Sequence, residues 1–280
     1  MKVAKIISTT CAPRTVREKT ILAGSPPRYS TGSQNYVKRE DVINLINLIL
    51  KEESKSDPGT NVDLIIVNNS IGDTIFDNFI DQFHNTSYTN GKIFVVKSNN
   101  IGWSFGAYNA GFKKFKNNYD YFIFTEDDTL ITRDNYASYA IDLFERIHNC
   151  GFVSYTGLSK SAFGKVGTET LHAHGGVGLS SKEVLTKVLK KNKNLPFCNN
   201  NSSYRKIILD GEVRFTNIIS ELGYVLAEIP DTNKFFDFAY DFQRGIDMPL
   251  RPTRVYYFLY VLLKKIRRAV YIFLKIIRIK

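Results

Sequence analysis

The stretch Tyr121-Phe122-Ile123-Phe124-Thr125-Glu126-Asp127-Asp128 decides the fold class. Its first four residues form a continuous apolar run, which is typical of a strand buried on both faces of a parallel sheet. Three carboxylates follow almost at once, where that strand ends. Ligands of open parallel α/β sheets bind outside the carboxyl ends of the strands, so this acidic cluster predicts a ligand site.

The same unit recurs on both sides of this stretch. An apolar run at 63–67 ends in the polar segment 68–73, and the first strand, at 1–7, ends in the polar residues 8–10. Helical patterns separate the runs. The expected helices are 39–53, 74–84, 103–116, 180–191 and 210–222, and the other expected strands are 92–96, 151–155 and 224–229. This alternation predicts an α/β fold with a mostly parallel, Rossmann-like sheet and helices on both faces.

Composition divides the chain into a body and a tail. The 280 residues are 43% apolar and 23% charged, as in an ordinary globular protein with a sizeable core. Residues 1–250 are expected to form one domain, with a long loop at 11–36 that is rich in Pro and Gly. The net charge of +11 is concentrated in 251–280, which holds nine basic residues and no acidic one, so the body carries only +2.

The tail pattern predicts a basic amphipathic helix. Four cations, Lys264, Lys265, Arg267 and Arg268, interrupt its apolar residues, so no run approaches the ~20 residues that a membrane span needs. Apolar and cationic residues on separate faces indicate an interfacial helix on an anionic membrane surface. A helix packed on the domain or in an oligomer interface is the alternative. A nucleic-acid-binding module is disfavoured because phosphate-binding arms rarely carry so many apolar residues.

The cysteines and the N-terminus indicate the compartment. Cys11, Cys150 and Cys198 show no CxxC spacing and cannot all pair, which argues against a disulfide framework and a structural zinc site. The N-terminal apolar run is too short for a signal peptide. A reducing cytoplasm is the expected setting, with the protein held peripherally on the inner membrane face.

The acidic triplet predicts a hard divalent cation. Converging carboxylates repel one another unless a cation lies between them, and Mg²⁺ or Mn²⁺ is usually held by one or two carboxylates together with substrate phosphates. Glu126 and Asp128 are the predicted metal ligands. The alternative is a solvated acidic turn that opens a helix at Thr129.

Several motifs occur in an order that resembles family 2 nucleotide-sugar glycosyltransferases of the GT-A fold. They are Asn68-Asn69-Ser70-Ile71-Gly72-Asp73, Asn99-Asn100-Ile101-Gly102, Ala107-Tyr108-Asn109-Ala110-Gly111 and Glu126-Asp127-Asp128. The likeness covers roughly residues 1–230. It implies a GT-A fold and a nucleotide-diphosphate sugar as donor, with uridine or thymidine as the expected nucleoside.

The resemblance also implies roles for these motifs. Asn68 and Asp73 would contact the nucleotide base, with Asn68 standing where the family commonly has Asp. The asparagine–glycine segment would shape the donor pocket, and the DxD-like triplet would bind metal and diphosphate. The remaining residues assigned to the donor site are Thr9, Thr10, Asn100, Gly102, Asn109 and Asp127.

An inverting glycosyltransferase also needs a carboxylate that takes the proton from the acceptor hydroxyl. The segment Leu209-Asp210-Gly211-Glu212-Val213 resembles the Glu-Asp motif of the family, and counting back from Gly223 puts Glu212 in the position of the catalytic Asp. Asp210 is the other candidate, because it suits a helix N-cap. A purely structural pair, with Asp210 capping the helix and Glu212 complementing its dipole, is the alternative.

Two histidines stand beside a glycine-rich turn, in His172-Ala173-His174-Gly175-Gly176-Val177-Gly178. They lie on the same side of an extended segment, and glycines let backbone approach a ligand closely. His172 and His174 are predicted to contact the acceptor or the diphosphate, or to supply a third metal ligand. A structural turn with hydrogen-bonded histidines is the alternative.

Together these features predict a metal-dependent, inverting hexosyltransferase of bacterial cell-surface polysaccharide synthesis. It would move a sugar from a nucleotide-diphosphate donor to a lipid-linked saccharide acceptor. A nucleotidyltransferase is the rival enzyme, although the sequence has no glycine-rich phosphate loop with a lysine after the first strand.

Overall fold

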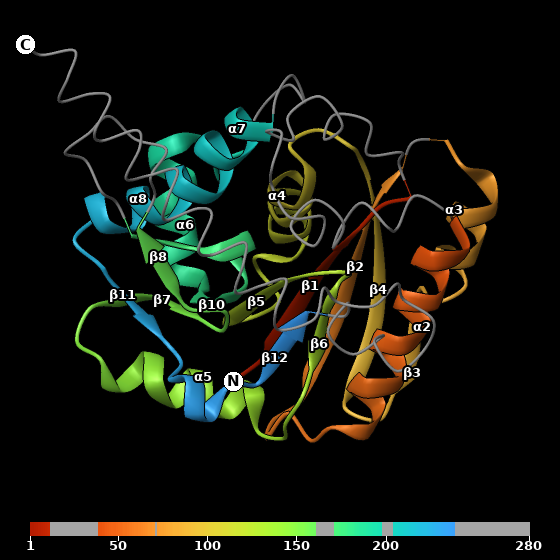
Figure 1. Ribbon diagram of the computed structural model, residues 1–280, viewed down its shortest axis with the longest axis horizontal. Coiled ribbons are helices and arrows are strands. Elements are labelled where there is room, and N and C mark those ends of the chain that lie inside the picture. The colour runs from red at the N-terminus through yellow and green to blue at the C-terminus, as the bar shows by residue number, and fades with distance from the viewer. Residues whose placement is uncertain (12–38, 71, 161–170, 198–203, 239–280) are drawn as a thin grey trace, which may run out of the picture.

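The computed structural model describes residues 1–11, 39–70, 72–160, 171–197 and 204–238 (Figure 1). The tail 251–280 and the loop 11–36, apart from Cys11, lie outside these residues, as does Cys198. No helix within the described ranges is long and apolar enough to cross a membrane.

An eight-stranded sheet forms the centre of the molecule. Its strands, in spatial order, are β11 (Val225–Glu228), β7 (Cys150–Ser154), β10 (Gly178–Ser181), β5 (Tyr121–Glu126), β1 (Val3–Thr9), β2 (Val62–Ser70), β4 (Gly91–Asn99) and β3 (Thr86–Tyr88). Six of them run in one direction, and only β10 and β3 are antiparallel to their neighbours. The predicted α/β class with a mostly parallel sheet is confirmed.

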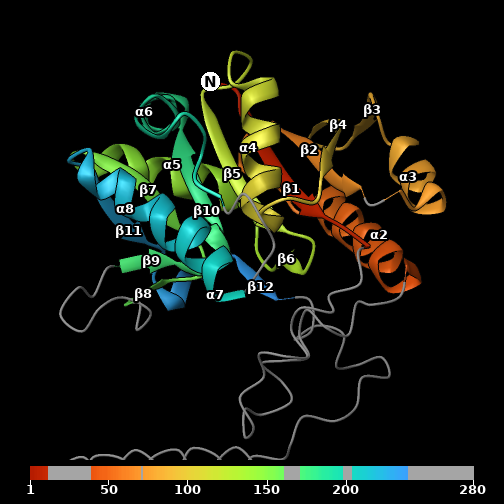
Figure 2. The same ribbon diagram turned by 90° about the horizontal axis from the view of Figure 1, so that it is seen from above.

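Helices cover both faces of this sheet. The bounds are α2 (Arg39–Lys55), α3 (Thr74–Asp81), α4 (Trp103–Phe115), α5 (Tyr136–Arg146), α6 (Lys182–Asn192), α7 (Tyr204–Ile207) and α8 (Arg214–Glu221). Neighbouring side chains on a strand point to opposite faces. On β1, Lys5 contacts α2, whereas Ile6 lies against Gly111 of α4. Accordingly, α2 and α4 lie on opposite sides of β1 (Figures 1 and 2).

The structure differs from the sequence-based expectation in several short elements. Thr129, expected to open a helix if the acidic run were only a turn, instead begins strand β6 (Thr129–Ile131), which pairs with β12 (Phe236–Phe238). Strands β8 (Leu158–Lys160) and β9 (Leu171–Ala173) also pair. Helix α5 was not expected from the sequence. The helix expected at 210–222 is divided into a π-helical turn, η3 (Ile208–Val213), and α8.

The thiols that the structure describes are buried and free. Burial raises the pKa of both Cys11 and Cys150 to about 11. A thiol with so high a pKa is protonated at neutral pH and is a poor nucleophile. Neither cysteine is therefore suited to covalent catalysis.

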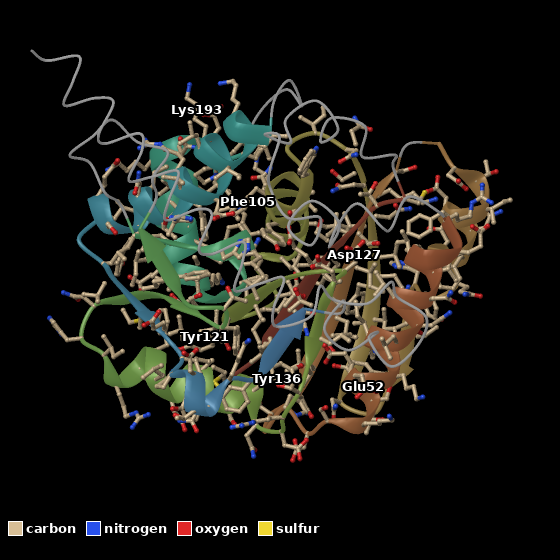
Figure 3. The ribbon with its side chains drawn as sticks, in the orientation of Figure 1. Glu52, Phe105, Tyr121, Asp127, Tyr136 and Lys193 are labelled. Carbon is tan, nitrogen blue, oxygen red and sulfur yellow. The ribbon has the colours of Figure 1, made fainter. Side chains whose placement is uncertain are left out.

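A buried ion pair ties the first strand to the helices of one face. Lys5 and Glu53 form a salt bridge, and both side chains are only 1% exposed. The Tyr136 hydroxyl donates to Glu53 at 2.9 Å, and the Lys5 ammonium lies 4.5 Å from the centre of the Phe236 ring. Figure 3 labels Tyr136 and Glu52, the neighbour of Glu53 on α2. The pair joins β1, α2, α5 and β12.

Removing one charge of this pair should be costly. We expect Glu53→Gln to lower the free energy of unfolding by about 3–5 kcal/mol, because the Lys5 charge would stay buried without its counter-ion. Urea unfolding of Glu53→Gln measures this loss. Glu52→Gln is the matched control, since its partner Lys55 is exposed. Equal stability of the two variants would contradict the assignment.

Candidate active site

The candidate site lies where the strand order reverses. From β1 the chain continues into β2 on one side, while β5 pairs with β1 on the other. The register pairs Thr9 with Asn68 and Ser8 with Glu126, so the polar ends of the three strands lie level with one another. Such a switch point in an open α/β sheet is where ligands bind.

The acidic turn is fastened to the end of β1. The Thr9 hydroxyl donates to Asp127 Oδ2 at 2.9 Å, and the Asp127 amide donates to the Ser8 carbonyl at 3.0 Å. Asp127 is 4% and Asp128 8% exposed, so the turn is buried rather than solvated. The neighbouring Thr10 hydroxyl donates to the Asn69 carbonyl at 3.0 Å. These bonds fix the predicted donor-site residues of β1, β2 and β5 relative to one another.

Glu126 faces the start of α4 and the glycine-rich turn. The Ser104 hydroxyl donates to Glu126 Oε1. On the other side, a Cβ placed on Gly175 would come within 3.2 Å of Glu126 Oε2. Gly175 has φ +63°, in the left-handed region that favours glycine. The turn therefore passes close to Glu126 because residue 175 has no side chain.

The same turn contacts Glu212. The Gly175 amide donates to Glu212 Oε2 at 3.1 Å, and His172 Nε2 lies 2.9 Å from Glu212 Oε1. His172 belongs to β9 and Glu212 to η3. Of the two predicted histidines, the structure brings His172 to the carboxylate cluster, while His174 is exposed.

Tyr108 lies close enough to these carboxylates for their charges to affect its pKa. It is buried in α4, between Phe105 and Phe124, and its hydroxyl donates to the Gly175 carbonyl at 3.2 Å. Burial raises the pKa of Tyr108 well above its usual value, and the negative charges of four acidic residues raise it further. In decreasing order of effect these are Glu126, Asp128, Asp127 and Glu212. Figure 3 labels Phe105 and Asp127 in the middle of the molecule.

The structure separates the two candidate bases. Glu212 is buried and touches the turn that approaches Glu126. Asp210 is 40% exposed and forms a salt bridge of 2.6 Å with Lys206, one helical turn earlier. A π-helical turn changes the angular spacing of side chains and is frequent at functional sites. Within η3, only Glu212 joins the carboxylate cluster.

The residues expected near the nucleotide base form a separate network on β2 and α3. Asn68 Nδ2 donates to Asp77 Oδ1 at 2.7 Å, and the Ser70 hydroxyl donates to the same carboxylate. Asp73 caps α3 by accepting from the Phe76 amide and pairs with Arg39 at 2.8 Å. Asp73 therefore has a structural role that its position in the motif did not reveal.

This cap makes the stability of the domain depend on pH. The Phe76 amide, and then Arg39, lower the pKa of Asp73 below its usual value. The charged form is therefore favoured by folding, and its contribution is present near neutral pH and lost as pH falls below about 4.

We expect Asp73→Asn, which keeps a capping side chain, to be less stable than wild type at pH 7 by less than about 1 kcal/mol. Urea unfolding should show the difference shrinking as pH falls below about 4. A difference that stays the same at pH 7 and at lower pH would contradict the charge-based explanation.

The asparagine–glycine segment leads from β4 into α4. Gly102 precedes α4 with φ +75°, and Asn69 Nδ2 donates to the Trp103 carbonyl at 3.1 Å. Asn109 is buried, and its Oδ1 accepts from the Leu195 amide at 3.0 Å. Asn100 lies at the carboxyl edge of the sheet, directly after β4. The segment thus connects β4 to α4 at the edge of the site, and Asn69 of β2 bonds to the first residue of α4. Asn109 joins α4 to the chain that follows α6.

The carboxylates of the acidic cluster suit a metal ion that a diphosphate also binds. Among the residues with described positions, no three His, Cys, Asp or Glu side chains are grouped so as to hold a metal by themselves. Mg²⁺ bound with a nucleotide takes only one or two carboxylates and completes its coordination with phosphate and water. Glu126, half-buried at the end of β5, and Asp128, in the buried turn that follows it, would supply these carboxylates. An all-protein metal centre does not fit the described residues.

The contacts that several residues make at this site were not predicted from the sequence, although Tyr108 belongs to the motif at 107–111. Ser104 and Tyr108 contact the cluster from α4, and Asp77 orients Asn68 from α3. A serine or tyrosine on an amphipathic helix gives no signal of its own. The glycine pair at 175–176 was the available signal, because two adjacent glycines mark a close backbone approach.

Comparison with known proteins does not place the chain in a family. No protein-family model matches it, and no curated protein matches it. Among solved structures it is similar to a mannosyltransferase from Pyrobaculum calidifontis in complex with GDP-Man and Mn²⁺, at 12% identity and TM-score 0.48. That match covers 82% of this chain and 55% of the mannosyltransferase chain.

Two further similar structures are nucleotide-related enzymes. One is the 4-diphosphocytidyl-2C-methyl-D-erythritol synthase of Anaerococcus prevotii, with 10% identity, TM-score 0.44 and coverage of 94% of this chain and 96% of that one. The other is a proposed nucleotide-diphospho-sugar transferase from Desulfovibrio desulfuricans, with 7% identity, TM-score 0.39 and coverage of 82% and 80%. Identities of 7–12% and TM-scores below 0.5 do not transfer an activity to this chain.

Proposed function

We propose that this chain is a metal-dependent, inverting glycosyltransferase that uses a nucleotide-diphosphate sugar. One observation carries the proposal: a carboxylate on η3 and the acidic turn after β5 approach the same glycine turn, at the switch point of a parallel sheet. Sugar transfer needs both groups, one to hold the donor diphosphate and one to deprotonate the acceptor. The order of the sequence motifs, which resembles that of family 2 glycosyltransferases, also supports the proposal.

The acidic turn and the strand ends would bind the donor. Thr9 supports the turn from the end of β1, and the next residue, Thr10, bonds to the Asn69 carbonyl of β2. Asn68, held by Asp77, lies beside them on β2. Mg²⁺ or Mn²⁺ would be held by Asp128 and Glu126, and when bound it supplies positive charge that stabilises the leaving nucleoside diphosphate. The chain's own part is to hold these carboxylates in a buried, fixed turn.

Glu212 would act as the general base. In the reaction, the acceptor oxygen forms a bond to the anomeric carbon, and its proton passes to Glu212. The bond from that carbon to the phosphate oxygen breaks, and the nucleoside diphosphate leaves with the electron pair. A base must lie within hydrogen-bond reach of the hydroxyl, so a buried carboxylate at the rim of the donor site suits this role better than the exposed Asp210.

A scan of nucleotide sugars with Mn²⁺ tests this function. We expect a UDP- or dTDP-sugar to raise the melting temperature of the protein in the presence of Mn²⁺ and to release nucleoside diphosphate slowly by hydrolysis. Nucleoside triphosphate formed from pyrophosphate and the nucleotide sugar would identify a nucleotidyltransferase instead. Stabilisation by RNA or DNA alone would favour the nucleic-acid-binding alternative.

The acceptor is proposed to be a lipid-linked saccharide of bacterial cell-surface polysaccharide synthesis, reached by attachment of 251–280 to the inner face of the membrane. The support for attachment is the sequence pattern of nine cations among apolar residues. Attachment would concentrate the enzyme on the surface where its acceptor resides.

Charge removal in the tail tests the attachment. Replacing Lys264, Lys265, Arg267 and Arg268 with Gln should weaken binding to vesicles containing phosphatidylserine, because each basic residue near an anionic surface contributes about 1 kcal/mol. Wild-type binding should also fall with salt. The control replaces Lys113, Lys114 and Lys116 at the end of α4. Vesicle co-sedimentation that is insensitive to both salt and the tail substitutions would contradict an electrostatic anchor.

A further inference from the structure

Two donors from one short segment hold the two oxygens of Glu212. His172 Nε2 lies 2.9 Å from Oε1, and the Gly175 amide lies 3.1 Å from Oε2. The side chains of His172 and Glu212 are only 9% and 10% exposed. A carboxylate bonded through both oxygens cannot rotate without breaking one of the bonds, so its orientation is fixed.

The segment that supplies these donors is itself restrained. His172 is in β9 and is paired with Ser159 of the neighbouring antiparallel strand β8. Gly175 adopts a left-handed conformation, and its carbonyl accepts from the Tyr108 hydroxyl at 3.2 Å. A Cβ on Gly176 would approach the Phe105 ring within 2.6 Å, so this turn is packed tightly on α4. The orientation of Glu212 is therefore set by β9 and α4, not only by η3.

The acidic and polar groups around the pair come from three directions. Glu126 at the end of β5 approaches Gly175, Tyr108 comes from α4, and Asp127 and Asp128 lie in the turn that follows Glu126. The clustered carboxylates repel Glu212, and this repulsion favours orientations that turn it away from the acidic turn. A fixed donor on Glu212 opposes that movement.

We infer that His172 is a positioning residue that aims the Glu212 carboxylate at the acceptor hydroxyl. This inference rests on the proposed function, in which Glu212 is the base. Each carboxylate oxygen keeps a lone-pair site after accepting one bond, so the held carboxylate can still take the acceptor proton. In this role His172 touches Glu212 rather than the donor diphosphate, the acceptor or a metal ion.

A pair of amide substitutions separates positioning from packing. His172→Gln places a side-chain N–H at a reach similar to that of Nε2, whereas His172→Asn is equally polar but too short to reach Glu212. We expect His172→Asn to lower kcat for metal-dependent release of nucleoside diphosphate at least about tenfold, because small displacements of a catalytic group are costly. KM for the donor should stay within about twofold. His172→Gln should recover most of the lost rate.

His148→Asn, an exposed site in the loop after α5, is the matched control and should retain the wild-type rate. Equal rates for His172→Asn and wild type would overturn the positioning role, as would equal losses in both His172 variants or a rise in KM for the donor. Loss of the folded state in either variant, monitored by circular dichroism, would show a purely structural role and overturn it too. Failure of wild-type protein to turn over any nucleotide sugar would instead overturn the proposed function, and the inference with it.

Discussion

Glu212→Gln should reduce sugar transfer by about a hundredfold to ten-thousandfold while leaving donor affinity near that of wild type. Glutamine has nearly the same shape, and its one carbonyl oxygen can still accept from one of the two groups that hold Glu212, His172 or the Gly175 amide, but it cannot take a proton from the acceptor. The loss should therefore appear in kcat and not in KM for the donor. Steady-state kinetics and titration calorimetry with the nucleotide sugar measure the two effects.

Asp210→Asn is the matched control for this prediction, because it alters a carboxylate two residues away that is exposed and paired with Lys206. We expect it to retain activity within about threefold of wild type, as for a surface ion pair. A collapse of kcat in Asp210→Asn, with Glu212→Gln fully active, would assign the base to Asp210. It would also mean that η3 rearranges when substrates bind.

Asp128→Asn should abolish transfer and weaken Mn²⁺-dependent binding of the donor diphosphate. A bound divalent cation contributes several kcal/mol to the stabilisation of developing charge, so the rate should fall about a thousandfold or more. Excess chelator should stop the wild-type enzyme in the same way. The binding of the nucleoside diphosphate with and without Mn²⁺, followed by calorimetry, separates metal loss from general damage.

Asp142→Asn, on the exposed side of α5, is the control for Asp128→Asn. Its activity and Mn²⁺ dependence should match those of wild type. Full activity of Asp128→Asn, or of wild-type protein in chelator, would remove the metal from the mechanism. Unfolding of Asp128→Asn in circular dichroism would instead give this buried residue a structural role.

The parts of the fold that the sequence predicted are those governed by local patterns. Continuous apolar runs marked β2, β4 and β5, and the polar residues at their ends marked one edge of the sheet. Parallel strands bring their carboxyl ends together, so the neighbourhood of Thr9, Asn68 and Glu126 followed from topology alone. No side-chain detail was needed for that step.

The details of the site depend on contacts between residues far apart in the chain. The link from His172 to Glu212 spans β9 and η3, and the π-helical turn that separates Asp210 from Glu212 has no pattern in the sequence. The cap made by Asp73 is local, since it accepts from the Phe76 amide, but its pairing with Arg39 joins residues far apart in the chain and gives no signal in the sequence. The short strands β6, β8, β9 and β12 were missed because three residues are too few to show a period.

The most direct test of a metal-dependent sugar transfer at this site is phosphorus NMR of the protein with nucleotide sugars and Mg²⁺, in the presence of a saccharide acceptor. The account predicts that one nucleotide sugar is converted to nucleoside diphosphate, that chelator stops the conversion, and that Glu212→Gln slows it at least about a hundredfold. Nucleoside monophosphate or triphosphate as the product, or nucleoside diphosphate formed equally fast by Glu212→Gln, would contradict it.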